Sequence, residues 1–395
     1  MADNKDKKVL NVPALRFPEF TGEWEKCKLS KVCSFFSGGT PPSSNKEYYN
    51  GNIPFIRSGE LHNDETELFI TKEGLDNSAA KMVEVGDLLL ALYGATSGEI
   101  AISKIKGAIN QAILCIRTKQ NKKFVESVWN KHVARLLQTY LQGGQGNLSA
   151  DIVKNIPFYF TNIEEQNKLA RFISLLDQRI AAQNKIIEKL QSLIKGIVDE
   201  LMTVLLKGKL YPFSSFYIKA GEGGTPTTSV NEYYLGGTIP FIKIEDLSCK
   251  YLTSNKDFIT ELGMQKSSAW LIPSHSVIYS NGATIGAISI NEYPICTKQG
   301  ILGIVPNTNI NVEYLYLLMS SSYFSKEVNR IVTEGTMKTA YLKDINHIKC
   351  PLPSMAQQQN ITNLTSSIEK KLFVEQELLK LLNIQKQHLL RTMFI

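Results

Sequence analysis

The sequence predicts a mixed α/β fold built as two tandem copies of one domain, each copy ending in a long helix. Three observations predict this fold: short motifs recur at a nearly constant distance, strand patterns lie within each copy, and each copy ends in a segment with heptad spacing. At 395 residues the chain is long enough for roughly two or three domains. We therefore divide it into a first body over 1–162, a first long helix over 163–207, a second body over 208–355 and a second long helix over 356–395.

Recurring motifs establish the duplication. Gly-Gly-Thr-Pro, Tyr-Tyr and Ile-Pro-Phe-Ile each occur twice, and a basic residue follows the last of them in both copies, Arg57 in the first and Lys243 in the second. The distance between matched motifs grows from 185 to 193 residues, as small loop insertions between two copies of one fold would cause. The matched stretches are 38–41 with 223–226, 48–49 with 233–234, 53–56 with 239–242, 94–96 with 282–284, 151–152 with 344–345, and 166–167 with 359–360.

Each body contains both strand and helix patterns. Short apolar runs bounded by Gly, Asn or Pro predict strands at 88–92, 112–116, 276–279 and 301–305. Apolar residues at three-to-four spacing predict helices over 124–141 and, more loosely, over 312–331. The matched glycines Gly39, Gly94, Gly224 and Gly282 are predicted to be turn residues that need unusual backbone angles.

The segments 163–206 and 356–393 lack proline and are predicted to be long helices. The first carries an unbroken heptad seam whose only polar member is Gln183, and its length would be roughly 60 Å at 1.5 Å per residue. Charged residues Glu375 and Lys386 interrupt the second seam. We expect an antiparallel intramolecular coiled coil with pseudo-two-fold symmetry; the alternative is that each helix packs onto its own body. The apolar seam positions are Leu169, Ile173, Leu176, Ile180, Ile187, Leu190, Ile194, Ile197, Leu201 and Val204, then Ile368, Leu372, Leu379, Leu382, Leu389 and Met393.

Charge gives weaker guidance. The formal net charge of +7 is compatible with a nucleic-acid partner without indicating one. The stretch 61–98 is mostly acidic and 99–135 mostly basic, which predicts oppositely charged faces on the first body. A basic face could contact phosphate, or it could be a solvated surface helix.

Several classes of function are disfavoured by what the sequence lacks. We find no apolar run long enough to span a membrane and no secretory leader, so we expect a cytoplasmic protein with no membrane partner. Six scattered cysteines without a Cys-x-x-Cys pair predict no metal site. The five histidines do not recur between the copies, and the glycine-rich loop 143–147 lacks the lysine of a phosphate loop. We therefore predict no catalytic residues.

A series of motifs, in order along the chain, resembles the specificity subunit of type I restriction–modification systems. The resemblance covers essentially the whole chain, in the order recognition domain, helix, recognition domain, helix. The second copy departs from the pattern, with Lys370 where the first has Asp177 and Gln358-Gln359 where it has Glu165-Gln166. The motifs are 13–18 (Pro-Ala-Leu-Arg-Phe-Pro), 22–25 (Gly-Glu-Trp-Glu), 38–41, 53–56, 147–149 (Asn-Leu-Ser), 156–157, 165–166 and 175–177 with Ile180.

This resemblance implies a function and a set of partners. Each body would be a target-recognition domain that reads one half of a bipartite, asymmetric site in double-stranded DNA, and the helices would fix the spacer between the halves. Two methyltransferase subunits that use S-adenosylmethionine would dock on the chain, and restriction motor-nuclease subunits would use ATP and magnesium. This chain would bind no cofactor and supply recognition only. The competing hypotheses are a coiled-coil adaptor that binds proteins or glycans, and a nuclease with an unrecognised site.

Nine polar residues are candidate DNA contacts. Arg57 and Lys243 follow equivalent strands, where a base or phosphate contact and an exposed ion pair are equally good explanations. Gln111 and Gln299 recur and could read adenine, or could hold a fold-stabilising hydrogen bond. Residues that read sequence should lie where the copies differ, as in 97–106 and 142–147 of the first copy. The candidates are Arg57, Lys104, Lys106, Gln111, Gln145, Asn147, Lys243, Gln299 and Lys338.

Overall fold

The computed structural model describes residues 10–141, 148–282, 284–332 and 338–395. By contacts the chain forms two units, one made of Met1–Asn184 with Glu377–Ile395 and the other of Lys185–Gln376. Each long helix contributes one half to each unit. The domain boundaries expected from sequence stay a prediction. None of the described helices is long and apolar enough to cross a membrane.

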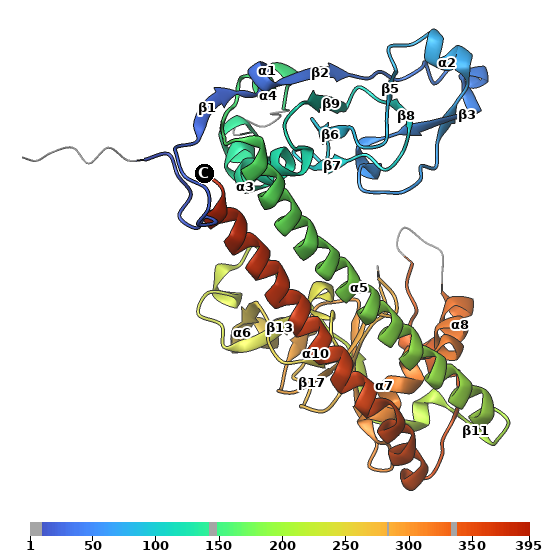
Figure 1. Ribbon diagram of the computed structural model, residues 1–395. Coiled ribbons are helices and arrows are strands. Elements are labelled where there is room, and N and C mark those ends of the chain that lie inside the picture. The colour runs from blue at the N-terminus through green and yellow to red at the C-terminus, as the bar shows by residue number, and fades with distance from the viewer. Residues whose placement is uncertain (1–9, 142–147, 283, 333–337) are drawn as a thin grey trace, which may run out of the picture. The chain divides into compact units, whose positions relative to one another are not determined.

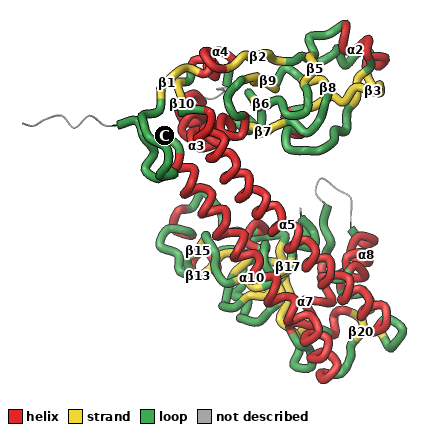
Figure 2. Tube along the Cα trace, viewed as in Figure 1, coloured by secondary structure: helices red, strands yellow, loops and turns green. Residues whose placement is uncertain are grey.

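The body of the first unit is built on two four-stranded sheets (Figures 1 and 2). In the first, all neighbouring strands are antiparallel, in the order β2 (Cys33–Ser37), β9 (Ile113–Thr118), β6 (Leu88–Ala91) and β7 (Ile100–Ile102). In the second, β3 pairs with β8 in parallel, in the order β4 (Phe69–Ile70), β3 (Tyr49–Ile56), β8 (Gly107–Ile109) and β5 (Lys81–Val83). The predicted strands at 88–92 and 112–116 are confirmed.

Strand β6 shows why its apolar run does not alternate with polar residues. Successive side chains of a strand point to opposite faces. Leu88 and Leu90 lie in the core that contains the long helices, whereas Leu89 and Ala91 lie in a second core between the sheets. Both faces are buried, so every position is apolar.

Helices and a small sheet connect this body to the first long helix. Strand β1 (Glu25–Lys28) pairs with β10 (Pro157–Phe160), directly before α5 begins. The predicted helix over 124–141 is α3, and its Phe124, Val128 and Trp129 are buried in the core. The remaining helices are α1 (Leu29–Val32), η1 (Lys46–Tyr48), η2 (Ser58–Glu60), α2 (Lys72–Asp76), α3 (Lys122–Leu141) and α4 (Ala150–Asn155).

The body of the second unit repeats this plan. Its larger sheet has the order β12 (Tyr217–Glu222), β19 (Ile301–Pro306), β16 (Val277–Ser280), β17 (Ile288–Asn291) and β14 (Tyr251–Leu252). Its smaller sheets are β15 (Asp257–Ile259), β13 (Ile239–Ile242) and β18 (Cys296–Thr297), and β11 (Leu210–Pro212) with β20 (Lys349–Pro351). Its short helices are η3 (Phe213–Ser215), η4 (Asn231–Tyr233), η5 (Ile244–Asp246), α6 (Glu261–Gln265), α7 (Val312–Ser320), α8 (Ser322–Ile331) and α9 (Leu342–Ile345).

The helix predicted over 312–331 is two helices. Helix α7 ends at Ser320, and the side chain of Ser321 accepts a hydrogen bond from the backbone N–H of Phe324 to cap α8. The loose apolar spacing of this segment reflects that break. The strands predicted at 276–279 and 301–305 are confirmed as β16 and β19.

The long helices α5 (Ile163–Leu205) and α10 (Met355–Met393) are antiparallel neighbours within each unit (Figure 1, green and red). In the first unit, Leu169 and Ile173 from the start of α5 share a core with Leu389 and Met393 from the end of α10. In the second unit, Met202 from the end of α5 shares a core with Ile361 from the start of α10. The predicted antiparallel pair is confirmed.

Most seam positions are covered as predicted. In α5, Leu169, Ile173, Leu176 and Ile187 are buried, while Ile180, Leu190 and Ile194 are half-buried; in α10, Leu382 is buried and Ile368, Leu372 and Leu379 are half-buried.

The seam prediction fails at the end of α5. Val204 is 62% exposed, and Val198 and Met202 are buried instead. These two side chains belong to the same core as residues of α7, so the end of α5 packs on the second body, which follows it in the chain. The alternative arrangement, in which a helix packs onto its own body, describes the start of α5, where Leu169 shares a core with Phe124.

The glycine prediction holds at one of the four positions. Gly94 has φ +88°, a backbone conformation that side chains with a Cβ rarely adopt. Gly39, Gly224 and Gly282 have ordinary φ values, so the prediction is wrong for them. Gly39 is needed for close approach, because a Cβ there would lie 2.5 Å from the Cβ of Ala79.

Candidate nucleic-acid interface

Loops from three strands meet at one end of the sheets of the first unit. The Gly-Gly-Thr-Pro loop follows β2, the loop containing Gly94 follows β6, and Gln111 lies in the turn between β8 and β9. The N–H of Gly39 donates to the carbonyl of Ile109, 3.2 Å away, and the N–H of Leu148 donates to the carbonyl of Leu92, 2.9 Å away. These bonds hold the loops together. Gln145 and Asn147, in the segment 142–147, lie outside the described residues.

The second unit brings the equivalent loops together with the same bonds. The N–H of Gly224 donates to the carbonyl of Thr297, 3.0 Å away, which matches the bond from Gly39 to Ile109 in the first copy. The hydroxyl of Tyr234 donates to the carbonyl of Pro226 at 2.5 Å, as the hydroxyl of Tyr49 donates to that of Pro41 at 2.5 Å. The matched motifs therefore build one loop cluster in each copy, and we call each a loop face.

The recurring glutamines lie on these loop faces with different surroundings. The side-chain oxygen of Gln111 accepts a hydrogen bond from the hydroxyl of Thr40, which orients its exposed amide. Gln299 is exposed and makes no side-chain hydrogen bond with the described residues. Of the two sequence-based explanations for a repeated glutamine, a local hydrogen bond therefore applies to Gln111.

Arg57 is held by two carboxylates rather than left free. Its guanidinium donates to Glu60 and to Glu67, each at 2.9 Å, and its backbone N–H donates to Glu60 at 3.0 Å. Burial alone would raise the pKa of the Glu60 carboxyl, but these bonds, with one from the hydroxyl of Thr66, lower the pKa to about 2. The ion pair with Glu60 also caps η2 and fixes the chain after β3.

Lys243 has the matching place and a similar role in the second copy. Its backbone N–H donates to Asp246 at 2.9 Å, and its ammonium pairs with Asp257 at 2.9 Å. In both copies a basic residue after the Ile-Pro-Phe-Ile strand is thus bound to acidic groups of its own body. The ion-pair explanation accounts for both residues.

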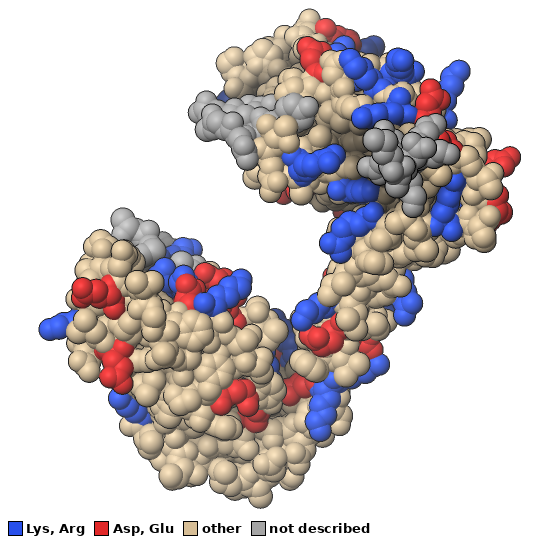
Figure 3. Space-filling view, turned by 90° about the vertical axis from the view of Figure 1, so that its left-hand side faces the viewer, with Lys and Arg blue, Asp and Glu red and all other residues tan. Residues whose placement is uncertain are grey.

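The prediction of oppositely charged faces on the first body is wrong. The acidic and basic stretches pair with each other across neighbouring strands and loops: Lys104 with Asp64 at 2.5 Å and Lys106 with Glu84 at 3.0 Å. Arg117 also pairs with Asp87 at 2.6 Å. The sequence did not reveal these ion pairs, because the paired residues are far apart in the chain and meet only when the two stretches fold against one another. Figure 3 shows basic and acidic side chains interspersed on the face it presents.

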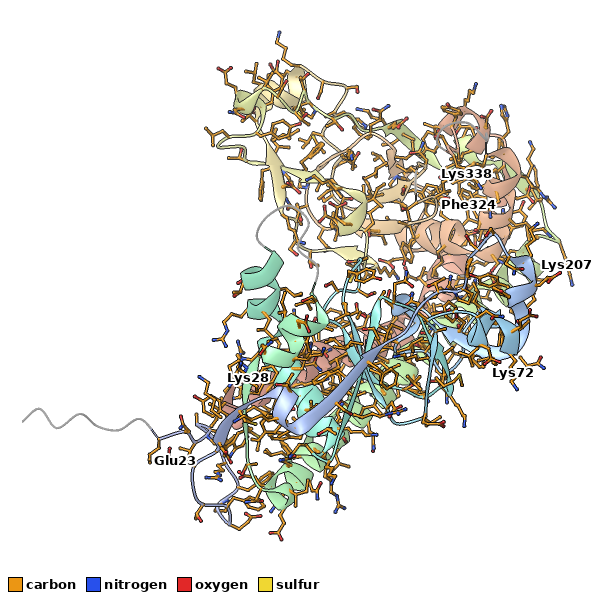
Figure 4. The ribbon with its side chains drawn as sticks, turned by 90° about the horizontal axis from the view of Figure 1, so that it is seen from above. Glu23, Lys28, Lys72, Lys207, Phe324 and Lys338 are labelled. Atoms are coloured by element: carbon orange, nitrogen blue, oxygen red, sulfur yellow. The ribbon has the colours of Figure 1, made fainter. Side chains whose placement is uncertain are left out.

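Lys338 is the candidate that follows the second undescribed segment, 333–337. Its side chain is exposed, and it lies close in sequence to Ala340, whose N–H donates to the carbonyl of Asn281 at 2.9 Å. That bond attaches the chain at Ala340 to the loop face of the second copy. Figure 4 labels Lys338 and the buried Phe324 of α8.

An apolar groove on the first unit was missed by sequence reasoning. It has a volume of about 580 Å³ and lies where the motif 13–18 crosses the start of α5. Phe17 meets Phe172 edge to face at 6.0 Å, and the ammonium of Lys168 lies 4.6 Å from the centre of the Phe17 ring. Leu175 and Phe172 are 56% and 37% exposed. Both side chains point away from the heptad seam, so the heptad pattern did not identify them as part of a surface site.

The motif 13–18 itself is fixed to α5 by an ion pair. The guanidinium of Arg16 donates two hydrogen bonds of 2.7 Å to the carboxylate of Glu165, which is nearly inaccessible to solvent. Across the described residues no group of three or more His, Cys, Asp or Glu side chains is placed to hold a metal ion.

Two copies of one α/β body, each with the same loops at one end of its sheets and each followed by a long helix, define a duplicated two-site recognition protein. The model of the type I restriction modification DNA specificity domain matches the chain over residues 21–192 and again over 217–383. The chain therefore belongs to the family of type I restriction–modification specificity subunits. This supports the DNA-recognition hypothesis over the adaptor.

The chain is similar to specificity subunits, in two of the three comparisons below over nearly its whole length. The MjaIX specificity subunit of Methanocaldococcus jannaschii is 23% identical over 386 residues, covering 90% of this chain and 89% of the relative. The EcoR124I/EcoR124II specificity subunit of Escherichia coli is 29% identical over 153 residues, covering 37% of each chain. The crystal structure of the specificity subunit from M. genitalium has a TM-score of 0.55 at 16% identity, covering 97% of this chain and 99% of that one.

Proposed function

We propose that this chain is the sequence-specific DNA-binding subunit of a type I restriction–modification complex, with each body reading one half of a bipartite, asymmetric target. The observation that carries the proposal is the family match over both copies, on bodies that present equivalent loop faces with different side chains. Equivalent frames with different side chains suit two different half-sites. Gln111, Gln299 and Lys338 are exposed beside these faces and are our candidates for base contacts, together with Gln145 and Asn147.

The paired cations have a second role in this proposal. Arg57, Lys104, Lys106 and Lys243 each form an ion pair within their own body. Exposed ion pairs are worth about 1 kcal/mol or less, so a phosphate can replace a surface carboxylate as the partner of Lys104 or Lys106. Arg57 and Lys243 stabilise the chain that follows their strands, because their backbone N–H groups also donate hydrogen bonds to Glu60 and Asp246.

The two long helices would set the spacer between half-sites and dock two methyltransferase subunits. The exposed groove around Phe172 and Leu175 gives the first unit an apolar surface for such a partner. In this scheme the methyltransferase uses S-adenosylmethionine, a motor-nuclease subunit uses ATP and magnesium, and this chain contributes no catalytic group.

Methylation sequencing tests the proposal directly. We expect co-expression of this chain with its methyltransferase partner to methylate adenine in a motif of two short specified halves separated by an unspecified gap. Cells expressing the methyltransferase alone are the control and should lack the motif. Absence of any gapped motif in the co-expressing cells would reject the proposal.

The spacer role has its own test. Deleting one heptad from α5 and the facing heptad from α10 keeps the seam in register. We expect the gap between the half-sites to change while both half-site sequences stay the same. An unchanged gap in an active complex would show that the helices do not set the spacer.

A further inference from the structure

A small pocket on the first unit gathers cations without acidic partners. It has a volume of about 260 Å³ and lies between α3 and the β1–β10 pair, away from the groove described above. Lys26 of β1 and His132, Arg135 and Thr139 of α3 line it, together with Phe158 and Tyr159 of β10. Figure 4 labels Lys28 at the end of the same strand, β1.

Aromatic rings make one wall of the pocket. The His132 ring stacks on Phe158 with ring centres 5.4 Å apart and an angle of 22° between the planes. The ammonium of Lys26 lies 5.6 Å from the centre of the Tyr159 ring, its partner across the β1–β10 pair. These contacts hold Lys26 and His132 on the same side of the small sheet.

The tautomer of His132 orients Arg135. Nε2 of His132 lies 2.9 Å from the main-chain oxygen of Ile395, which can only accept, so Nε2 carries the hydrogen. Burial lowers the pKa of His132, and the cations Lys131 and Arg135 lower it further against the opposing bond to Ile395. The neutral ring then offers its Nδ1 lone pair to Arg135 Nη2, 3.4 Å away. Arg135 is therefore directed by the imidazole of His132 rather than by a side-chain carboxylate.

The neighbouring basic side chains likewise have no side-chain carboxylate as an ion-pair partner among the described residues. Lys131 donates to the main-chain oxygen of Phe394, and the pKa of its ammonium is lowered by burial and by Arg135. None of the ion pairs found in the described parts of the chain includes Lys26, Lys131, His132 or Arg135. A partly enclosed site with excess positive charge favours an anion.

The described residues of the second copy differ at the matching place. There the matching strand pair presents Leu210, Tyr211 and Cys350, and the nearby Arg330 is paired with Glu327. Basic residues that occur at this place only in the first copy, such as Lys26, are not needed for the fold that both copies share, which indicates that they have another role.

We propose that Lys26 and Arg135, beside the rings of His132 and Tyr159, bind a phosphate group. The planar guanidinium of Arg135 suits two phosphate oxygens, and Lys26 supplies a point charge from the opposite wall. The phosphate belongs either to the DNA backbone, which rests on the proposed function, or to a free nucleotide. Because Leu210 stands at the place of Lys26 in the second copy, binding there would distinguish the two copies.

Two arms of one experiment separate these sources, using the full chain with Arg135→Gln, Lys26→Gln and the control Lys72→Gln. Lys72 is exposed at the start of α2 and makes no ion pair with the described residues (Figure 4). In the first arm, affinity for a mixed-sequence duplex is measured against salt concentration. If the backbone is the ligand, each pocket variant lowers the salt slope by about one, and the control leaves it unchanged.

In the second arm, the rise in Tm caused by inorganic phosphate or ATP is measured at constant ionic strength. If a nucleotide is the ligand, the rise disappears in both pocket variants while the duplex slope stays at the wild-type value. If both pocket variants keep the wild-type salt slope and the wild-type rise in Tm, the proposal that the pocket binds phosphate is rejected. Failure of the wild-type chain to bind any duplex would reject the proposed function instead, and the second arm would still decide the pocket.

Discussion

Gln166 and Gln358 make the same hydrogen bonds at the starts of α5 and α10. The side-chain oxygen of Gln166 accepts from the N–H of Asn121 at 3.1 Å, and that of Gln358 accepts from the N–H of Asn311 at 2.7 Å. Each amide donates to a main-chain carbonyl five residues earlier, Gln166 at 2.7 Å and Gln358 at 2.9 Å. Both side chains are fully buried.

This pair corrects the repeat register at the long helices. Sequence matching aligned Gln166-Asn167 with Gln359-Asn360, but the bonds align Gln166 with Gln358, an offset of 192 residues rather than 193. Asp177 then corresponds to Glu369, not to Lys370. The apparent departure at Lys370 arises from that one-residue slip, whereas at the start of the helix Gln357 still stands where the first copy has Glu165.

We predict that Gln166→Leu and Gln358→Leu each destabilise their unit by about 1–3 kcal/mol. Each change leaves a buried main-chain N–H and a carbonyl without their partner. Urea unfolding measures the loss. Gln178→Leu is the matched control, because Gln178 is exposed on α5. Equal stability of the control and the buried variants would contradict the bonding role.

The Glu60–Arg57 pair predicts a specific acid sensitivity. The pKa of Glu60 falls from an ordinary 4.5 to about 2 on folding, so its contribution is complete above pH 4.5 and is lost as the pH falls toward 2. That contribution is on the order of 2 kcal/mol. We expect Glu60→Gln to flatten the pH dependence of the unfolding free energy in this window. Glu67→Gln, at an exposed position, should keep the wild-type slope; identical slopes for all three proteins would refute the prediction.

The two copies place an aromatic ring at the same site from different positions in the chain. Phe36 of β2 lies under the ammonium of Lys81 and the guanidinium of Arg117, at 5.9 and 5.0 Å. The equivalents of Phe36 and Lys81 are Gly221 and Trp270, and a Cβ on Gly221 would lie 3.4 Å from Nε1 of Trp270. The indole thus fills the space that the phenyl ring fills in the first copy.

We predict that Gly221→Phe destabilises the second unit by about 1–3 kcal/mol, because a second ring overpacks the site. Adding Trp270→Lys recreates the arrangement of the first copy and should restore most of the loss. Urea unfolding of both variants tests this. A double variant no more stable than Gly221→Phe alone would show that the exchange is not compensatory.

The groove at Phe172 predicts a binding defect without a folding defect. Burying a leucine at an interface contributes about 1.5–3 kcal/mol, so Leu175→Ser should weaken association with the methyltransferase by at least about tenfold. Because Leu175 is 56% exposed, the Tm of the isolated chain should change little. Calorimetric titration with the partner measures the Kd. Gln178→Ser on the same helix is the control, and equal Kd values for both variants would remove this groove from the docking surface.

Local patterns predicted most of the elements. The helix expected over 163–206 is observed at Ile163–Leu205, and that expected over 356–393 at Met355–Met393, because their heptad spacing and absence of proline depend only on nearby residues. The four predicted strands were found for the same reason. At the candidate site, sequence reasoning identified the loops that meet but not the partners of their side chains.

What failed depended on contacts between distant segments. Lys104 and Lys106 were expected on a basic face, yet their partners Asp64 and Glu84 come from a stretch many residues earlier. The pocket at Arg135 likewise needs β1, β10 and α3 together, and no spacing within any one of them signals it.

The sequence by itself determined the duplication, the antiparallel helix pair and the family, because repeats and heptads are properties of residue order. Tertiary structure decided which cations are neutralised, why Gly39 must be glycine, and where α5 leaves its seam at Val204 to pack on the second body. All three features depend on which segments pack against one another in the folded chain. The charge or size of a side chain affects stability only through the residues that lie next to it after folding.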